Sequence, residues 1–207
     1  MKALILVDIQ NDFLPGGALA VPDGDDVVPV ANHIQALFEL VVATQDWHPA
    51  DHGSFAANHP GRKVFDEIDL NGLRQTLWPS HCVQNTAGAD FPSGLNRAGI
   101  NKIFQKGTDA RIDSYSGFFD NGHRKATGLG EFLKLRQVTD VFVAGLATDY
   151  CVKFTALDAL AIGFKTHLIA DACRGVNLEP EDATKAIEEM KRAAVNIISS
   201  PQLSFLQ

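Results

Sequence analysis

Short apolar runs rich in β-branched residues recur along this chain, and segments with helical periodicity separate them. The runs do not alternate between polar and apolar positions, which is typical of strands that are buried on both faces of a sheet. They lie at Ala3–Val7, Leu40–Thr44, Lys102–Gln105, Val138–Gly145, Lys165–Ala170 and Val195–Ser199. We therefore expect six buried strands.

The segments between these runs carry apolar residues at helical spacing. They lie at Asp25–Phe38, Thr127–Leu135, Asp149–Ile162 and Pro180–Ala194. Strands that alternate with helices are joined by right-handed crossovers and form a parallel sheet with helices on both faces. The length of 207 residues corresponds to one domain. We predict a single three-layer α/β domain over residues 1–207.

One segment departs from this alternation. Residues 46–101 are rich in Gly, Pro, Asn and His, and they contain only a short predicted helix near Asp69–Leu77. A stretch this long with little regular structure inside a compact domain is usually functional. We expect an elaborated loop region that binds metal and substrate.

Composition excludes several classes of protein. The formal net charge of -7 argues against a nucleic-acid-binding surface, which needs clustered positive charge. No apolar segment approaches the ~18 residues of a membrane span, and Asp8 interrupts the first apolar run, unlike in a secretory signal. The three cysteines include no CxxC pair and are too few for a disulfide framework. We expect a cytoplasmic protein with free thiols.

Reactive residues follow four of the predicted strands. In chain order they are Asp8, Asp46, Lys106 and Cys151. Ligands of an open parallel sheet bind beyond the carboxyl ends of its strands. A single Asp after a strand is usually a turn residue, and a lone Cys is usually a small buried one. Four reactive side chains at one edge of the sheet are better explained by an active site.

The chemistry of these residues is complementary. Cys151 would lie in the first turn of a helix, where free amides favour negative charge, so we expect a thiolate in the free enzyme. Asp8 can accept the thiol proton and return it to a leaving amine, while Lys106 holds the carboxylate and stabilises the thiolate. Backbone amides at the start of the helix can form an oxyanion hole. The pattern predicts acyl transfer from an amide through a thioester.

A second group of residues lies in the loop region. Asp46 and His48 are two residues apart, so both point to the same side of an extended chain, and His81 follows later. One carboxylate and two imidazoles suit zinc, iron or manganese and leave positions open for water or substrate. The Asp-x-His pattern alone is common by chance, so this prediction depends on the neighbouring nucleophile. His52 and His59 are expected to be solvated surface histidines.

Taken in order, these motifs resemble those of the nicotinamidases, which belong to the isochorismatase-like cysteine hydrolase superfamily. The motifs are VDIQNDF around Asp8, DWH at 46–48, WPSHC at 78–82, KG at 106–107 and ATDYCV at 147–152. The resemblance covers nearly the whole chain. It implies a Rossmann-like fold around a six-stranded parallel sheet and hydrolysis of nicotinamide to nicotinate and ammonia in NAD salvage. Many members also hydrolyse pyrazinamide.

Carried over position by position, the resemblance implies a catalytic triad of Asp8, Lys106 and Cys151. Phe13 and Trp78 would form the aromatic walls of the substrate pocket. The amides of Ala147 and Cys151 would form the oxyanion hole, with a cis peptide bond between Leu146 and Ala147.

The resemblance also implies one divalent metal ion, usually zinc, with iron or manganese in some members, which would bind the pyridine nitrogen. Its ligands would be Asp46, His48 and His81. Some nicotinamidases have a further His or Glu ligand where this chain has Ser54. Ser54 is therefore a candidate fourth ligand, directly or through water, and His52 is a nearby substitute.

Other functions leave different signatures. An amidase of the same superfamily acting on a carbamoyl or ureido substrate would share the triad without the metal set, and it is the main alternative. An isochorismatase would lack the Cys151 nucleophile, and a binding protein without catalysis would have a broken triad. We expect a small-molecule substrate, and the sequence leaves both a monomer and a homodimer open. Asp171 is expected to be structural, and Cys82 and Cys173 to be bystanders.

Overall fold

A computed structural model describes the backbone of residues 1–206 and the side chains of residues 1–203. Six strands form one sheet in the order β5-β2-β1-β6-β7-β8, and every neighbouring pair is parallel. The strands are β1 (Lys2–Val7), β2 (Leu40–Asp46), β5 (Lys102–Lys106), β6 (Asp140–Leu146), β7 (Lys165–Arg174) and β8 (Asn196–Ile198). The prediction of six strands in a parallel sheet is confirmed.

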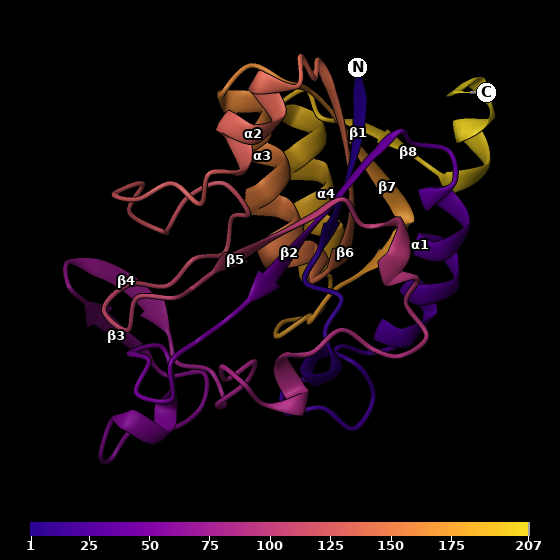
Figure 1. Ribbon diagram of the computed structural model, residues 1–207. Coiled ribbons are helices and arrows are strands. Elements are labelled where there is room, and N and C mark those ends of the chain that lie inside the picture. Colours follow the sequence, from indigo (N-terminus) through magenta and orange to yellow (C-terminus); the bar gives the residue numbers. More distant parts are fainter. Residues whose placement is uncertain (207) are drawn as a thin grey trace.

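Helices cover both faces of this sheet (Figure 1). Helix α1 (Val27–Gln35) lies on one face, and the other face carries α2 (Leu129–Leu135), α3 (Lys153–Ala161) and α4 (Asp182–Arg192). Alternate side chains of β1 point to opposite faces of the sheet. Leu4 packs in the core beside α1, and Ile5 packs in the core beside α3. The three-layer α/β fold is therefore confirmed.

The predicted helix near Asp69–Leu77 is wrong. This segment forms an antiparallel hairpin of β3 (Glu67–Leu70) and β4 (Leu73–Thr76). Asn71 and Gly72 connect the strands with φ angles of 54° and 85°. An Asn-Gly pair favours two-residue hairpin turns because both positions need positive φ. That local preference overrides the weak helical spacing.

The rest of the long loop region has little regular structure, as expected. Along the chain, short 3-10 turns lie at Asn11–Phe13, Gly24–Asp26, Ala56–Asn58, Ala87–Ala89, Arg97–Gly99 and Ser200–Leu206.

Asp171 accepts hydrogen bonds from the amide of Ser200 at 2.7 Å and from its hydroxyl at 2.5 Å. This carboxylate therefore ties the C-terminal turn to β7, which is a structural role.

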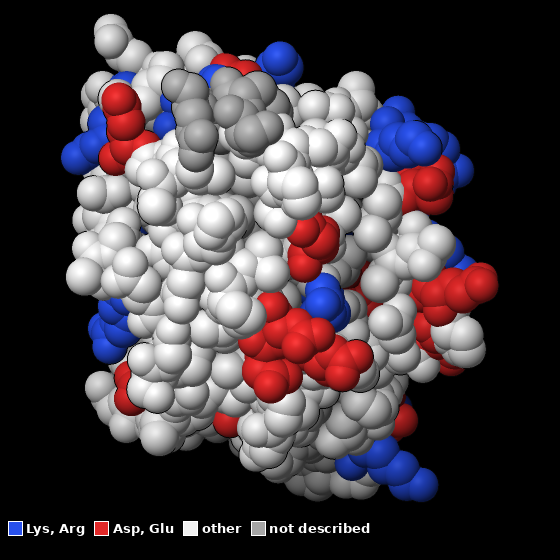
Figure 2. Space-filling view, turned by 90° about the vertical axis from the view of Figure 1, so that its right-hand side faces the viewer, with Lys and Arg blue, Asp and Glu red and all other residues white. Residues whose placement is uncertain are grey.

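The surface carries charges of both signs. On the face seen in Figure 2, acidic side chains gather beside a smaller basic group. Asp25 and Asp26 lie in the turn before α1, and Asp26 forms an ion pair with Arg174 at 3.1 Å. Within residues 1–206, no helix combines the length and the apolar character needed to cross a bilayer.

Candidate active site

Four adjacent strands bring the predicted reactive residues to one edge of the sheet. Asp8 follows β1, Asp46 and Lys106 are the last residues of β2 and β5, and Cys151 lies in the turn after β6. Asp46 and Lys106 are paired in register. All four side chains are buried, with Asp8 completely inaccessible. Parallel pairing therefore assembles the group that the strand ends predicted.

The ammonium group of Lys106 lies at the centre of this group. It is 2.9 Å from Oδ2 of Asp8, 2.5 Å from Oδ1 of Asp46 and 3.4 Å from Sγ of Cys151. It also donates a hydrogen bond to the carbonyl of Ser114 at 2.8 Å. The ammonium thus contacts both carboxylates and the thiol sulfur at once.

Burial and charge shift the protonation of these groups. Burial raises the pKa of Asp8 to about 6, although Lys106 and a 2.7 Å hydrogen bond from the Thr44 hydroxyl act in the opposite direction. Burial alone would lower the pKa of Lys106, but the carboxylates of Asp46 and Asp8 raise it well above its usual value. Lys106 is therefore a fixed cation, and Asp8 can exchange a proton near neutral pH.

Cys151 differs from the expected thiolate. The residue lies in a π-helical turn, Thr148–Val152, and α3 begins only at Lys153. Burial raises the pKa of the Cys151 thiol well above its usual value, although the Lys106 ammonium lowers it. The free enzyme therefore holds a thiol at neutral pH, because desolvation outweighs the nearby cation.

The predicted metal ligands also converge. Nε2 of His48 and Nε2 of His81 lie 3.6 Å and 4.0 Å from Oδ2 of Asp46. Nδ1 of His48 contacts the carbonyl of Gly107 at 2.9 Å, and Nδ1 of His81 contacts that of Pro79 at 2.8 Å. Carbonyls only accept hydrogen bonds, so both Nδ1 atoms carry a proton, and both Nε2 atoms, the positions left for a metal ion, face Asp46. This donor set fits a divalent transition metal.

Three features of this group bear on cation binding. Burial and the neighbouring His48 lower the pKa of His81 to about 4, so its ring is neutral at neutral pH. Burial would also lower the pKa of His48, but Asp46 raises it above its usual value, and a metal ion would replace that proton. Gly107 has a φ of 63°, and a Cβ there would lie 2.3 Å from Cε1 of His48. Only glycine fits against this ring.

The prediction that His52 and His59 are solvated is wrong. His52 is completely buried, its ring centroid is 4.4 Å from that of His48, and its Nδ1 bonds the Ser54 hydroxyl at 2.7 Å. His59 is half-buried and bonds the carbonyl of Gly53 at 2.7 Å. The loop is folded inward because Phe55 pairs with Trp78 and is fully buried. Ser54 as a fourth ligand stays a prediction.

A pocket lies above Cys151, and the predicted Phe13 and Trp78 form part of its wall. Sequence reasoning missed other residues of the same wall, namely Leu19, Asp113, Tyr115, Tyr150 and Val176. Ala147 lines the pocket too, and the peptide bond between Leu146 and Ala147 is cis, as expected. Cys82 and Cys173 are buried and do not line it.

Hydrogen bonds fix the aromatic part of this wall. The Tyr115 hydroxyl accepts hydrogen bonds from Nε1 of Trp78 at 3.1 Å and from Nε2 of Gln75 at 3.0 Å. The same Gln75 amide lies 3.1 Å from Oδ2 of Asp113. The ring of Tyr150 meets that of Trp78 edge-on, with centroids 4.8 Å apart. The ring of Trp78 is therefore held between Tyr115 and Tyr150, nearly perpendicular to both, in the pocket wall beside the thiol.

Comparison with known proteins places the chain in a family. The isochorismatase domain matches residues 2–202. The chain belongs to the isochorismatase domain family. A nicotinamidase of Escherichia coli (strain K12) is 51% identical over 200 residues, which cover 95% of this chain and 93% of that protein.

Solved structures agree with this placement. A nicotinamidase/pyrazinamidase of Acinetobacter baumanii has a TM-score of 0.95 and 48% identity, covering 98% of this chain and 97% of that one. The pyrazinamidase of Pyrococcus horikoshii in complex with zinc has a TM-score of 0.78 and 40% identity, covering 96% of this chain and 98% of that one. Within the isochorismatase domain family, the chain therefore groups with nicotinamidases and pyrazinamidases.

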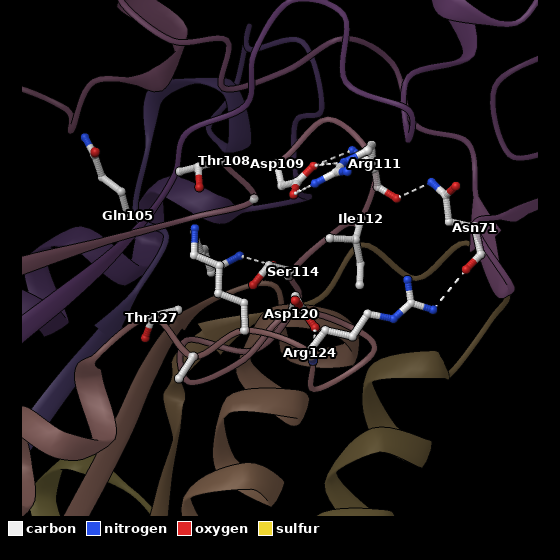
Figure 3. A pocket seen from close by; sticks show the side chains of 14 residues that line it. Asn71, Gln105, Thr108, Asp109, Arg111, Ile112, Ser114, Asp120, Arg124 and Thr127 are labelled. Carbon is white, nitrogen blue, oxygen red and sulfur yellow. Dashed lines mark hydrogen bonds and ion pairs between the residues drawn. The ribbon is translucent and has the colours of Figure 1, made fainter.

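This isochorismatase domain has a second cavity, of about 490 Å³, along the segment from Gln105 to Ser114 (Figure 3). Both arginines of its lining already have partners within the chain. Arg111 forms an ion pair with Asp109 at 2.9 Å, and Arg124 donates a hydrogen bond to the carbonyl of Asn71 at 2.9 Å. The described lining includes no cysteine or histidine. The pocket at Cys151 is therefore the candidate active site.

Proposed function

We propose that this protein is a nicotinamidase, a hydrolase of an amide C–N bond that converts nicotinamide to nicotinate and ammonia. One observation carries the proposal. Beside one aromatic pocket, the carboxylate of Asp46 contacts both the Lys106 ammonium next to Cys151 and the two imidazoles that could hold a metal ion. Identity of 51% to the Escherichia coli nicotinamidase supports it. Pyrazinamide, a similar planar amide, is proposed as a second substrate.

The first half of the reaction forms a thioester. Sγ of Cys151 attacks the amide carbon, and the thiol proton passes to Asp8. Oxygen of Asp8 and sulfur of Cys151 lie within 4.8 Å of each other, close enough for transfer once substrate is bound. The C–N bond then breaks, and Asp8 returns the proton to the leaving nitrogen, which departs as ammonia.

The second half regenerates the enzyme. Asp8 takes a proton from water, whose oxygen attacks the thioester carbon. The C–S bond breaks, the proton on Asp8 returns to sulfur, and the product acid gives its remaining proton to solvent and is released as nicotinate. Lys106 remains charged throughout and stabilises the carboxylate and each anionic sulfur, because its raised pKa prevents it from losing its proton. A pKa of about 6 suits Asp8 to both directions of transfer.

The oxyanion of the tetrahedral intermediates would be held by the amides of Ala147 and Cys151. The carbonyl of Ala147 accepts hydrogen bonds from the amides of Tyr150 and Val152, both at 3.1 Å, which fixes the turn. Fixed backbone donors stabilise a developing negative charge without reorganisation.

Asp46, His48 and His81 would hold one divalent metal ion, with zinc as the first candidate and iron or manganese as alternatives. A bound metal ion supplies a Lewis acid that can hold the ring nitrogen of the substrate. The orientation of both histidines supports this assignment, and the related Pyrococcus horikoshii pyrazinamidase is a zinc complex. Phe13 and Trp78 would sandwich the ring.

Three free thiols support a cytoplasmic location.

Ammonia release tests the proposal against the main alternative, an amidase for carbamoyl or ureido substrates. We expect release from nicotinamide and little from a carbamoyl compound, because the aromatic walls and the ring-nitrogen site suit a pyridine. Metal content is measured on the same sample. A preference for the carbamoyl compound would overturn the assignment.

A further inference from the structure

Gln10 is a buried residue of the VDIQNDF motif for which the mechanism has no use. Its side chain is completely inaccessible. Oε1 accepts a hydrogen bond from the amide of Asp46 at 2.8 Å, and Nε2 donates to the carbonyl of Asp46 at 2.8 Å. Nε2 also donates to the carbonyl of Ala89 at 2.9 Å. One side chain thus satisfies both main-chain polar groups of Asp46.

This contact replaces a missing stretch of strand pairing. The ladder between β1 and β2 ends with Leu6 opposite Ala43, three residues before Asp46. Beyond it the main chain turns away, and Asp8 has a φ of 47°. The amide of Gln10 takes the place of a neighbouring strand, while β5 pairs with the other side of Asp46 through Lys106.

The position of Asp46 determines how its two carboxylate oxygens are used. Oδ1 lies 2.5 Å from Nζ of Lys106, and Oδ2 faces His48 and His81 at 3.6 Å and 4.0 Å. A small shift of the main chain would bring both oxygens onto Lys106 or turn Oδ2 away from the imidazoles. Residues that orient metal ligands commonly change metal affinity about 10–100-fold when they are replaced.

We propose that Gln10 is a positioning residue of the metal site. By holding the main chain of Asp46, it aims Oδ2 at His48 and His81 while Oδ1 stays on Lys106. This inference rests on the metal site of the proposed function.

Gln45 offers a matched control. Its side chain is buried and donates to the same carbonyl of Ala89 at 2.9 Å, and its Oε1 accepts a hydrogen bond from Gln105 at 3.2 Å. It makes no side-chain hydrogen bond to Asp46 among the described contacts. Gln10→Met and Gln45→Met each remove one buried amide of similar size, but only the first releases Asp46.

The experiment measures Zn²⁺ affinity of the metal-free full-length proteins by competition with a chromophoric chelator. We expect Gln10→Met to weaken binding about 10–100-fold and Gln45→Met to stay close to the parent. Gln10→Glu keeps the acceptor for the Asp46 amide but loses the donor to its carbonyl, so it should also bind more weakly. Thermal unfolding of the metal-free variants is recorded alongside.

Kinetics provide a second readout. Gln10→Met should raise KM for nicotinamide while changing the hydrolysis of benzamide little, because benzamide has no ring nitrogen. A purely structural defect would instead lower kcat/KM for both amides. Parent-like Zn²⁺ affinity in Gln10→Met and Gln10→Glu would overturn this inference. Absence of Zn²⁺ binding by the parent would instead overturn the metal site of the proposed function.

Discussion

Nζ of Lys106 lies 2.5 Å from Oδ1 of Asp46, and the two residues are paired in register at the ends of β5 and β2. Strand pairing itself therefore builds this contact. Since the second oxygen of Asp46 faces the two imidazoles, the ion pair joins the proton-transfer group to the metal-ligand group. A change in charge on one side is therefore expected to affect the other.

The first prediction concerns the acid limb of the pH profile. Asp8 must be ionised to accept the thiol proton, and its pKa is raised to about 6. We expect kcat/KM for nicotinamide to fall as the pH drops through about 6, because the protonated acid cannot act as a base. Asp8→Asn should be nearly inactive at every pH. A parent profile that stays flat well below pH 6 would contradict this role.

The second prediction concerns the nucleophile. Because burial raises the pKa of the Cys151 thiol, alkylation by iodoacetamide should be slow at neutral pH and accelerate as the pH rises. Cys151 should react before Cys82 and Cys173, since it alone of the three lines the pocket. Nicotinate should protect it.

Cys151→Ala completes this test. The variant should release no ammonia and still bind metal, because the thiol is not among the proposed ligands. If it released ammonia at a rate near the parent's, a different nucleophile would be responsible, and Asp8 and Lys106 would need new roles.

The third prediction separates substrate anchoring from bond cleavage. His48→Ala should lose the metal ion, as measured by elemental analysis, since one of three ligands is removed. Benzamide should be a much poorer substrate than nicotinamide for the parent, because a metal ion that holds the ring nitrogen acts by positioning the amide near Cys151. Equal kcat/KM for the two amides would remove the metal from substrate recognition.

Much of the site could be predicted because its residues end strands. Asp8, Asp46 and Lys106 follow buried runs, and the rule that parallel strands present their carboxyl ends at one edge brings them together. The hairpin at Asn71-Gly72 could also have been predicted, because an Asn-Gly pair favours a two-residue turn. The prediction of a helix overlooked this pair.

Other features depend on contacts between distant segments and leave no local pattern. Gln75 meets Tyr115 across 40 positions, and His52 is buried only because Phe55 folds in against Trp78. The protonation of Cys151 likewise follows from how completely the pocket encloses it, which a position near a helix start does not reveal.

The last prediction concerns Tyr115, whose hydroxyl accepts hydrogen bonds from Trp78 and Gln75. Tyr115→Phe leaves Nε1 of Trp78 without its acceptor, at a cost of about 1–3 kcal/mol for a buried unsatisfied group, whereas the Gln75 amide keeps Asp113. We expect a lower Tm and a higher KM for nicotinamide, because Trp78 is less firmly held. kcat should change little, since the hydroxyl bonds none of Asp8, Lys106 and Cys151. Tyr150→Phe is the control: its ring also contacts Trp78, but its hydroxyl makes no hydrogen bond with a described residue. If both variants matched the parent in Tm and KM, the network would have no part in shaping the pocket.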